Sequence, residues 1–159
     1  MTTTDNTITL EEAYQFFNKR LFDSKLGKCV INLYPAGVNK GFFIKNSFKE
    51  KGRKDRDEIV LNPDIFVGGT DTEILSTLVH EMAHKWQHDY GKPGKHGFHN
   101  KEWAKAMKKI GLKPFNLVNP SRETGPACSQ TIEKDGLFAQ ACEELAAKRL
   151  KLKRQLEKK

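Results

Sequence analysis

The chain has 159 residues, of which 37% are hydrophobic and 30% are charged, and its formal net charge is +8. This length indicates one domain with a modest core, and no apolar run is long enough to span a membrane. Three widely spaced cysteines without a CxxC pair exclude a disulfide scaffold and a zinc ribbon. Because the N-terminus lacks a basic region followed by an apolar run, we expect a cytoplasmic protein. We also expect a monomer that has no membrane partner.

The N-terminal half predicts one helix followed by short strands. We expect residues 1–8 to be disordered and residues 10–21 to form a helix that begins at a capping box of Thr9 and Glu12. The charged segment 49–57 has the composition of a hairpin loop or flap. The strand-like runs suggest a small, mainly antiparallel, three-stranded sheet and cover residues 29–34, 41–44 and 58–61.

The C-terminal half is mainly helical in this interpretation. Residues 68–71, which contain two glycines, precede a long helix that ends near Tyr90. A second helix covers residues 101–110. Residues 120–132 have no regular pattern, and residues 137–159 are typical of a terminal helix with a basic end. The order of the elements predicts an α+β fold.

Two histidines in the long predicted helix have the spacing of metal ligands. His80 and His84 are four residues apart, so both side chains lie on one helix face and can bind the same ion. Glu81 lies about 100° round the helix from His80, from where it can reach a water on the metal rather than the metal itself. This is the HExxH arrangement of zinc metallopeptidases, with two ligands and a general base. All five histidines of the chain lie between His80 and His99.

A catalytic zinc usually has three protein ligands, so a third ligand is needed. His88 is eight residues from His80, about 12 Å along the helix axis, and cannot easily reach the same ion. The spacing that metzincins use to place a third histidine is absent. Glu102, on the following predicted helix, and His96 and His99, just before it, remain as candidates.

Two segments around these residues resemble a known family. The first is residues 78–87, which contain HExxH, and the second is residues 97–103, in which His99 stands three residues before the Glu-aromatic pair Glu102-Trp103. This combination resembles the SprT-like metallopeptidase family, which includes the Spartan-type proteases of DNA–protein crosslink repair. The resemblance extends over roughly residues 10–125 and implies that His99 is the third zinc ligand, with Glu102 and His96 ranked behind it.

The resemblance also implies an architecture and a chemistry. We expect a zincin-like metallopeptidase core in residues 9–125, after the disordered residues 1–8, and a C-terminal extension with a basic helix in residues 126–159. The expected cofactor is Zn²⁺, with Glu81 as the general base that activates water against a peptide bond. Glu102 is expected to orient a ligand imidazole through its other ring nitrogen. Tyr90 is a candidate second donor to the reaction intermediate.

The net positive charge favours a polyanionic partner, so we expect a protease for protein or peptide substrates, including proteins bound or crosslinked to DNA. The alternative is a non-catalytic nucleic-acid-binding or regulatory protein with a structural zinc. Such a site usually has four protein ligands and no need of a general base at Glu81. The residues expected to contact DNA are Lys45, Lys49, Lys51, Arg53, Lys54, Lys148, Arg149, Lys151, Lys153 and Arg154.

Overall fold

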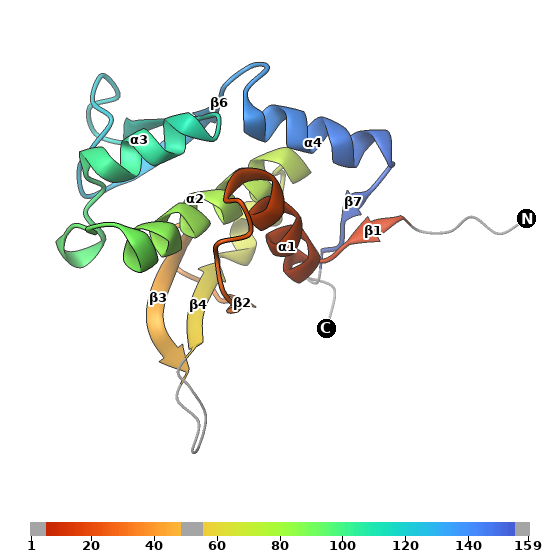
Figure 1. Ribbon diagram of the computed structural model, residues 1–159, viewed down its shortest axis with the longest axis horizontal. Helices are drawn as coiled ribbons and strands as arrows, with labels where there is room; N and C mark the ends of the chain where they lie inside the picture. The colour runs from red at the N-terminus through yellow and green to blue at the C-terminus, as the bar shows by residue number, and fades with distance from the viewer. Residues whose placement is uncertain (1–5, 49–55, 155–159) are drawn as a thin grey trace, which may run out of the picture.

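The computed structural model describes residues 6–48 and 56–154, which form four α-helices and three small sheets in an α+β arrangement (Figure 1). The helix α2 lies between a three-stranded sheet on one side and a layer of α3, α4 and a two-stranded sheet on the other. Short 3₁₀ turns cover Pro63–Phe66 and Lys95–Gly97. The elements are β1 (Thr7–Ile8), α1 (Leu10–Leu21), β2 (Cys29–Leu33), β3 (Gly41–Phe48), β4 (Arg56–Leu61), α2 (Asp71–Tyr90), α3 (Lys101–Lys109), β5 (Leu112–Asn116), β6 (Cys128–Ile132), α4 (Leu137–Ala147) and β7 (Lys151–Leu152).

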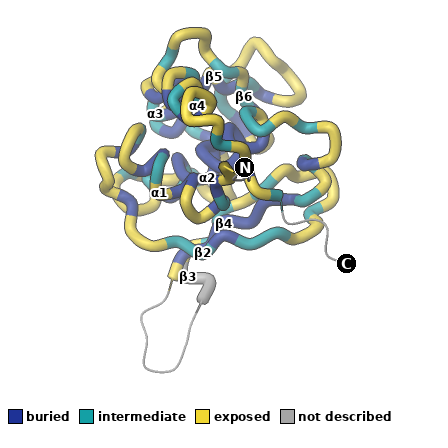
Figure 2. Tube along the Cα trace, turned by 90° about the vertical axis from the view of Figure 1, so that its right-hand side faces the viewer, coloured by how far each residue is buried: buried dark blue, intermediate teal, exposed yellow. Residues whose placement is uncertain are grey.

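The helix α2 is the centre of the fold, and it is mainly buried (Figure 2). It begins at a complete capping box, in which the Thr70 side chain accepts from the backbone N–H of Glu73 and the Glu73 side chain accepts from the backbone N–H of Thr70. The capping box of Thr9 and Glu12 at the start of α1 is likewise confirmed. These reciprocal hydrogen bonds satisfy backbone donors that a helix N-terminus leaves unpaired, which fixes where both helices begin.

The three-stranded sheet is mixed, so the expectation of a mainly antiparallel sheet is wrong. The strand order is β2-β4-β3, with β4 antiparallel to β3 and parallel to β2. The physical reason lies in β4, where Ile59, Val60 and Leu61 are all buried. A strand with apolar residues on both faces is most stable in the middle of a sheet, so β4 separates the two strands that precede it in sequence. As a consequence, β3 forms an edge of this sheet.

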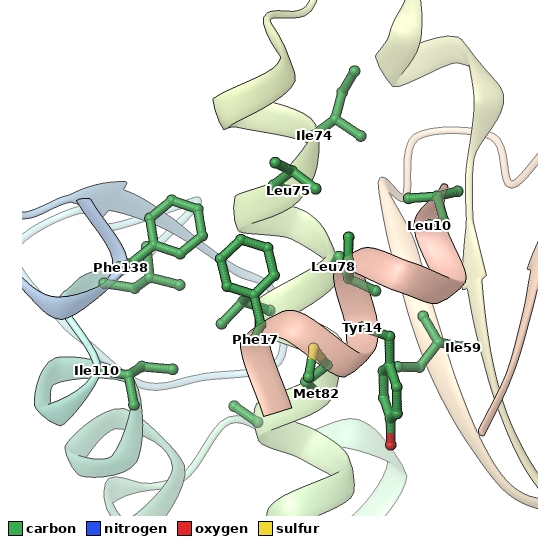
Figure 3. Packing of buried hydrophobic residues seen from close by; sticks show 14 of the residues in the cluster. Leu10, Tyr14, Phe17, Ile59, Ile74, Leu75, Leu78, Met82, Ile110 and Phe138 are labelled. Carbon is green, nitrogen blue, oxygen red and sulfur yellow. The ribbon is translucent and has the colours of Figure 1, made fainter. Parts of the chain in front are cut away.

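The main core lies where α1, α2 and α4 meet (Figure 3). The rings of Phe17 from α1 and Phe138 from α4 stack with their centroids 5.4 Å apart. Leu78 and Met82 of α2 are fully buried in the same cluster. Tyr14 directs its hydroxyl away from the cluster, where it donates to the carbonyl of Gly27. The core is thus built largely on one helix, so any residue on α2 has a well-fixed backbone.

A second, antiparallel sheet pairs β5 with β6 and packs beside α3. The expectation that residues 120–132 are irregular is wrong for the last five of them, which form β6. The backbone of β6 is hydrogen-bonded to β5, which lies twelve or more residues earlier, so no local sequence pattern predicts the strand. The segment between the two strands returns to His99, with which Gly125 forms an isolated antiparallel β-bridge.

The C-terminal helix is shorter than expected. Instead of continuing to residue 159, α4 ends at Ala147, and Arg149 adopts a positive φ of 58°. The chain then forms β7, which pairs in parallel with β1. Leu152 is buried there and its backbone N–H donates to Asp71 at the start of α2. Burial of Leu152 and this contact stabilise an extended chain over further helix.

The pairing with β7 also changes the interpretation of the N-terminus. Of residues 1–8, which we expected to be disordered, Thr7 and Ile8 form β1, and Ile8 is buried. The expected loop or flap at residues 49–57 lies mostly outside the described residues, and its last two positions belong to β4. Within the described residues, every helix is too short or too polar to cross a membrane.

Candidate metal centre

Three histidines from two separate segments converge beside α2. His80 and His84 project from the middle of this helix, and His99 lies just before α3. One ring nitrogen from each residue lies within 4.8 Å of the other two, and Nε2 of His80 is 3.3 Å from Nε2 of His99. Three nitrogen donors at this spacing can surround a single metal ion. Their grouping is the strongest chemical feature of the described part of the chain.

Hydrogen bonds at the ring nitrogen Nδ1 orient two of the imidazoles. Nδ1 of His80 lies 2.6 Å from Oε1 of Gln130, and Nδ1 of His99 lies 3.0 Å from the carbonyl oxygen of Gly125. A carbonyl oxygen only accepts, so both Nδ1 atoms carry the proton and both Nε2 atoms keep a free lone pair. Gln130 is itself fixed, because its Nε2 donates to Ser76 Oγ at 3.2 Å. The Nε2 lone pairs are therefore directed toward one another, as a metal site requires.

Trp103 supports all three imidazoles from one side. It is fully buried on α3, and its ring centroid lies 4.8 Å from that of His80, 5.2 Å from that of His84 and 4.5 Å from that of His99. A rigid indole of this size restricts the rotation of each ring. The side chain has no exposed surface, so it acts through packing.

The protein keeps the three imidazoles neutral. Burial lowers the pKa of His80 to about 3, with a further contribution from the neighbouring His99. Burial and the other two histidines lower the pKa of His84 well below its usual value, and burial lowers the pKa of His99. Only a neutral imidazole can bind a metal, so these shifts favour metal binding down to acidic pH.

Glu81 lies beside the histidine cluster without joining it. Its Oε2 is 4.0 Å from Nε2 of His80, and the side chain is buried. Burial raises the pKa of Glu81 to about 8 in the absence of a metal ion. A divalent cation next to the carboxyl group would favour its ionised form. The residue is thus close enough to exchange a proton with a molecule bound between the histidines.

The other candidates named from the sequence lie elsewhere. The Glu102 carboxylate accepts from Gln87 Nε2 and from the backbone N–H of Lys92, and these hydrogen bonds lower its pKa. It therefore joins the end of α2 to the start of α3 and is not part of the histidine cluster. His96 is exposed and is not in the cluster. The Tyr90 hydroxyl donates to the backbone carbonyl of Lys25, away from the site.

Sequence reasoning missed Gln130 and Gly125. Gln130 is 50 residues from His80 along the chain, in a strand that had no recognisable pattern. Gly125 has a φ of 135°, and a Cβ atom there would lie 2.3 Å from Nδ2 of Asn116. Only glycine fits this backbone position, but a single glycine in a loop gives no signal of its role.

The histidines and Glu81 line a cleft of about 350 Å³. The edge strand β3 contributes Gly41, Phe42 and Phe43 to one wall, and the segment after β5 contributes Leu117 to the lining. Lys40 lines this cleft and also an adjoining cavity of about 460 Å³. It is the one lysine or arginine among the described residues that line the metal-site cleft.

The basic residues predicted from the sequence are only partly available. Among those that the structure describes, Lys45 pairs with Asp89, Lys148 with Glu144, and Arg154 with Asp71. Arg149, Lys151 and Lys153 make no ion pair with a described residue. Lys49, Lys51, Arg53 and Lys54 lie outside the described residues.

The fold and the site together define an α+β domain with a candidate three-histidine metal centre. The model of the SprT-like family matches residues 3–123, more than half of the chain. The chain therefore belongs to the SprT-like family, as the two motif segments predict. No curated protein matches it. The family match ends before Gly125 and Gln130, which support two of the histidines.

Proposed function

We propose that this protein is a zinc-dependent endopeptidase with a zincin-like core, in which His80, His84 and His99 bind Zn²⁺ and Glu81 is the general base. The observation that carries the proposal is the convergence of three neutral imidazoles, with a buried carboxylate 4.0 Å from one of them, in one cleft. The donor set fits the metal, since three imidazole nitrogens leave a fourth tetrahedral position open. Bound Zn²⁺ would supply an acidified water and polarise the substrate carbonyl.

The residues of the chain have distinct tasks in this proposal. Gln130 and the Gly125 carbonyl keep the proton on Nδ1 of His80 and His99, so that Nε2 remains a ligand. Glu81 accepts the proton of the attacking water and passes it to the leaving amine. The exposed edge of β3 runs along the cleft, where an extended peptide can pair with its backbone.

We further propose that the substrates include proteins bound or crosslinked to DNA. The net charge of +8 supports this choice, because a basic protein associates with polyanions and with the complexes that contain them. The alternative, a structural zinc in a non-catalytic protein, requires a fourth protein ligand. Among the described residues the candidate cluster contains three.

The test compares wild type with Glu81→Gln, which keeps the three histidines. Both proteins are loaded with zinc, their metal content is measured, and each is incubated with a basic DNA-binding protein alone, with single-stranded DNA and with duplex DNA. We expect both to bind one equivalent of zinc and only wild type to cut, faster when DNA is present. If both bind zinc and neither cuts under any condition, the non-catalytic alternative replaces the proposal.

A further inference from the structure

A second, larger groove lies on the other side of the segment that borders the metal-site cleft. It has a volume of about 1300 Å³ and is formed by α3, by β5 and by the segment between β5 and β6. Residues 120–124 line this groove, whereas Leu117 and Pro126, in the same β5–β6 segment, line the cleft. The groove and the cleft are therefore neighbours, because one segment of chain lines both.

The lining of this groove is strongly basic. Lys101, Lys105 and Lys108 are spaced by four and three residues, so they form a row along one side of α3. Lys113 and Arg122 face them from β5 and from the segment that follows it. Glu123 is the one acidic residue among the described residues that line the groove, and it pairs with Lys108 at 2.8 Å.

The four remaining cations make no ion pair with a described carboxylate. Of the basic residues expected from the sequence, Lys45, Lys148 and Arg154 are paired. Arg149, Lys151 and Lys153 also make no ion pair with a described residue, but they do not line this groove. Four cations around one hollow repel one another, and a polyanion in the groove would relieve that repulsion.

The groove also contains an aromatic ring. In β5, Lys113 is exposed and Phe115 is half-buried, whereas the residues that alternate with them are buried. Both side chains therefore reach the groove from the same face of the strand. An aromatic ring among cations suits single-stranded nucleic acid, because its phosphates meet the cations and its unpaired bases can stack on the ring. In a duplex the base faces are already stacked.

We propose that this groove binds single-stranded nucleic acid, with Lys101, Lys105, Lys113 and Arg122 contacting phosphates and Phe115 stacking on a base. The inference deepens the proposed function, and its biological role rests on that function: a strand in the groove would hold a crosslinked or bound protein next to the metal-site cleft. Binding itself requires no catalysis, so it is tested separately.

The segment between the two hollows is well fixed, which supports a preformed site. The Asn116 side chain donates to the Thr124 carbonyl at 2.8 Å and accepts from the backbone N–H groups of Val118 and Asn119. The Asn116 N–H donates to the Arg122 carbonyl. These bonds hold the backbone beside Arg122 in place before any ligand binds, so little order has to be gained on binding.

The experiment measures the fluorescence anisotropy of a labelled oligothymidylate with the full-length protein over a series of salt concentrations. The test variant is Lys105→Glu with Lys113→Glu. The control is Lys19→Glu with Lys134→Glu, which makes the same change in net charge at exposed positions away from the groove. A third variant, Phe115→Leu, keeps an apolar side chain and removes the aromatic ring. Thermal unfolding establishes that all variants are folded.

We expect the test variant to bind about tenfold or more weakly at low salt, with a slope of log K against log salt reduced by about 1.4 for two lost phosphate contacts. Phe115→Leu should weaken binding about fivefold or more, the lower end for one stacked base. The control variant should bind like wild type.

Equal losses in the test and control variants would overturn the proposal, because they would show attraction by net charge alone. The assignment to a single strand would be overturned if unlabelled duplex or polyglutamate displaced the probe as well as unlabelled single strand does. Hydrolysis of a DNA-free protein substrate is measured in parallel. If the test variant loses binding but still hydrolyses this substrate, the groove is supported as the binding site. If wild type binds the single strand but hydrolyses nothing, only the proposed peptidase activity is contradicted.

Discussion

Nδ1 of His80, in the middle of α2, lies 2.6 Å from Oε1 of Gln130 in β6, 50 residues further along the chain. The same glutamine donates to Ser76, one turn earlier on α2, so it is held at both ends of its amide group. This relationship connects a helix and a sheet that are distant in sequence. It also fixes which nitrogen of His80 can bind a metal, because the proton stays on Nδ1.

Gln130→Ala should weaken metal binding. The substitution leaves Nδ1 of His80 without its acceptor, so the ring loses its fixed tautomer and orientation, and we expect zinc affinity to fall about 10–100-fold. Competition with a chromophoric chelator measures the affinity. Gln140→Ala, at an exposed position on α4, is the matched control and should bind like wild type. Wild-type affinity in Gln130→Ala would show that His80 does not depend on this support.

Gly41→Ala should reduce both stability and peptidase activity. A Cβ atom at Gly41 would lie 2.7 Å from the carbonyl oxygen of Val60 and 3.4 Å from Oε2 of Glu81, so strand β3 must move away from β4 and from the proposed base. Gly27→Ala is the control, because its Cβ atom would meet nothing within 4 Å. The midpoint temperature of thermal unfolding and kcat/KM should both fall in Gly41→Ala. Gly27→Ala should match wild type or be more stable by about 0.4–1 kcal/mol.

Lys85→Met should destabilise the fold strongly. Lys85 is 4% exposed and donates to Asp57 at 2.6 Å and to Asp89 at 3.0 Å. Burial alone would lower the pKa of Lys85, but the two carboxylates outweigh it and raise the pKa, so the ammonium group remains charged. Its removal leaves buried negative charge without this partner, which costs about 3 kcal/mol.

Urea denaturation measures that loss. Lys148→Met is the matched control, because Lys148 makes an exposed ion pair with Glu144 at 3.6 Å, and its loss should cost less than about 1 kcal/mol. Similar effects in the two variants would mean that the Lys85 pair adds no more than a surface contact.

The metal-free protein should lose stability as the pH falls below about 6.5. The folded state holds the pKa of His80 at about 3, whereas the unfolded chain takes up this proton near pH 6.5. Between these values the unfolded state binds more protons, so the free energy of unfolding decreases with falling pH, by up to about 1.4 kcal/mol per pH unit for each such group. Unfolding in the presence of a chelator measures the slope, which should be smaller in His80→Gln.

Glu81 should act in the opposite direction. Its pKa is raised from 4.5 to about 8 in the metal-free fold, so the folded state keeps a proton that the unfolded chain releases above pH 4.5. The contribution of Glu81 to the stability of the metal-free protein therefore decreases as the pH rises from 4.5 to 8. Glu81→Gln should remove this decrease. An unchanged pH dependence in the variant would show that Glu81 is already ionised without metal.

Lys40→Met should impair turnover without preventing metal binding. Lys40 is the one lysine or arginine among the described residues that line the cleft, and it also borders the adjoining cavity. A cation there can stabilise the negative charge that develops on a substrate carbonyl. We expect kcat to fall at least about tenfold, with Lys40→Arg retaining part of it. A change confined to KM would assign Lys40 to substrate binding instead.

The local chemistry of this protein is readable from its sequence. The capping boxes at Thr9 and Thr70 involve residues three positions apart, and the pairing of His80 with His84 on one face involves residues four positions apart. Such short-range patterns depend on helix geometry alone. The choice of His99 over His96 and Glu102 rests on the resemblance to the SprT-like family, and the structure brings His99 to the other two histidines.

What the tertiary structure decided depends on contacts between distant segments. No local pattern specifies the partners in three such contacts. These are the parallel pairing of β2 with β4, the pairing of β6, which carries Gln130, with β5, and the hydrogen bond from the Leu152 N–H to Asp71. The basic groove has the same origin, since Lys105 and Lys113 lie on different elements and share a surface only after α3 packs on β5. Hydrophobic burial selects these pairings over the whole chain, so they exist only in the folded protein.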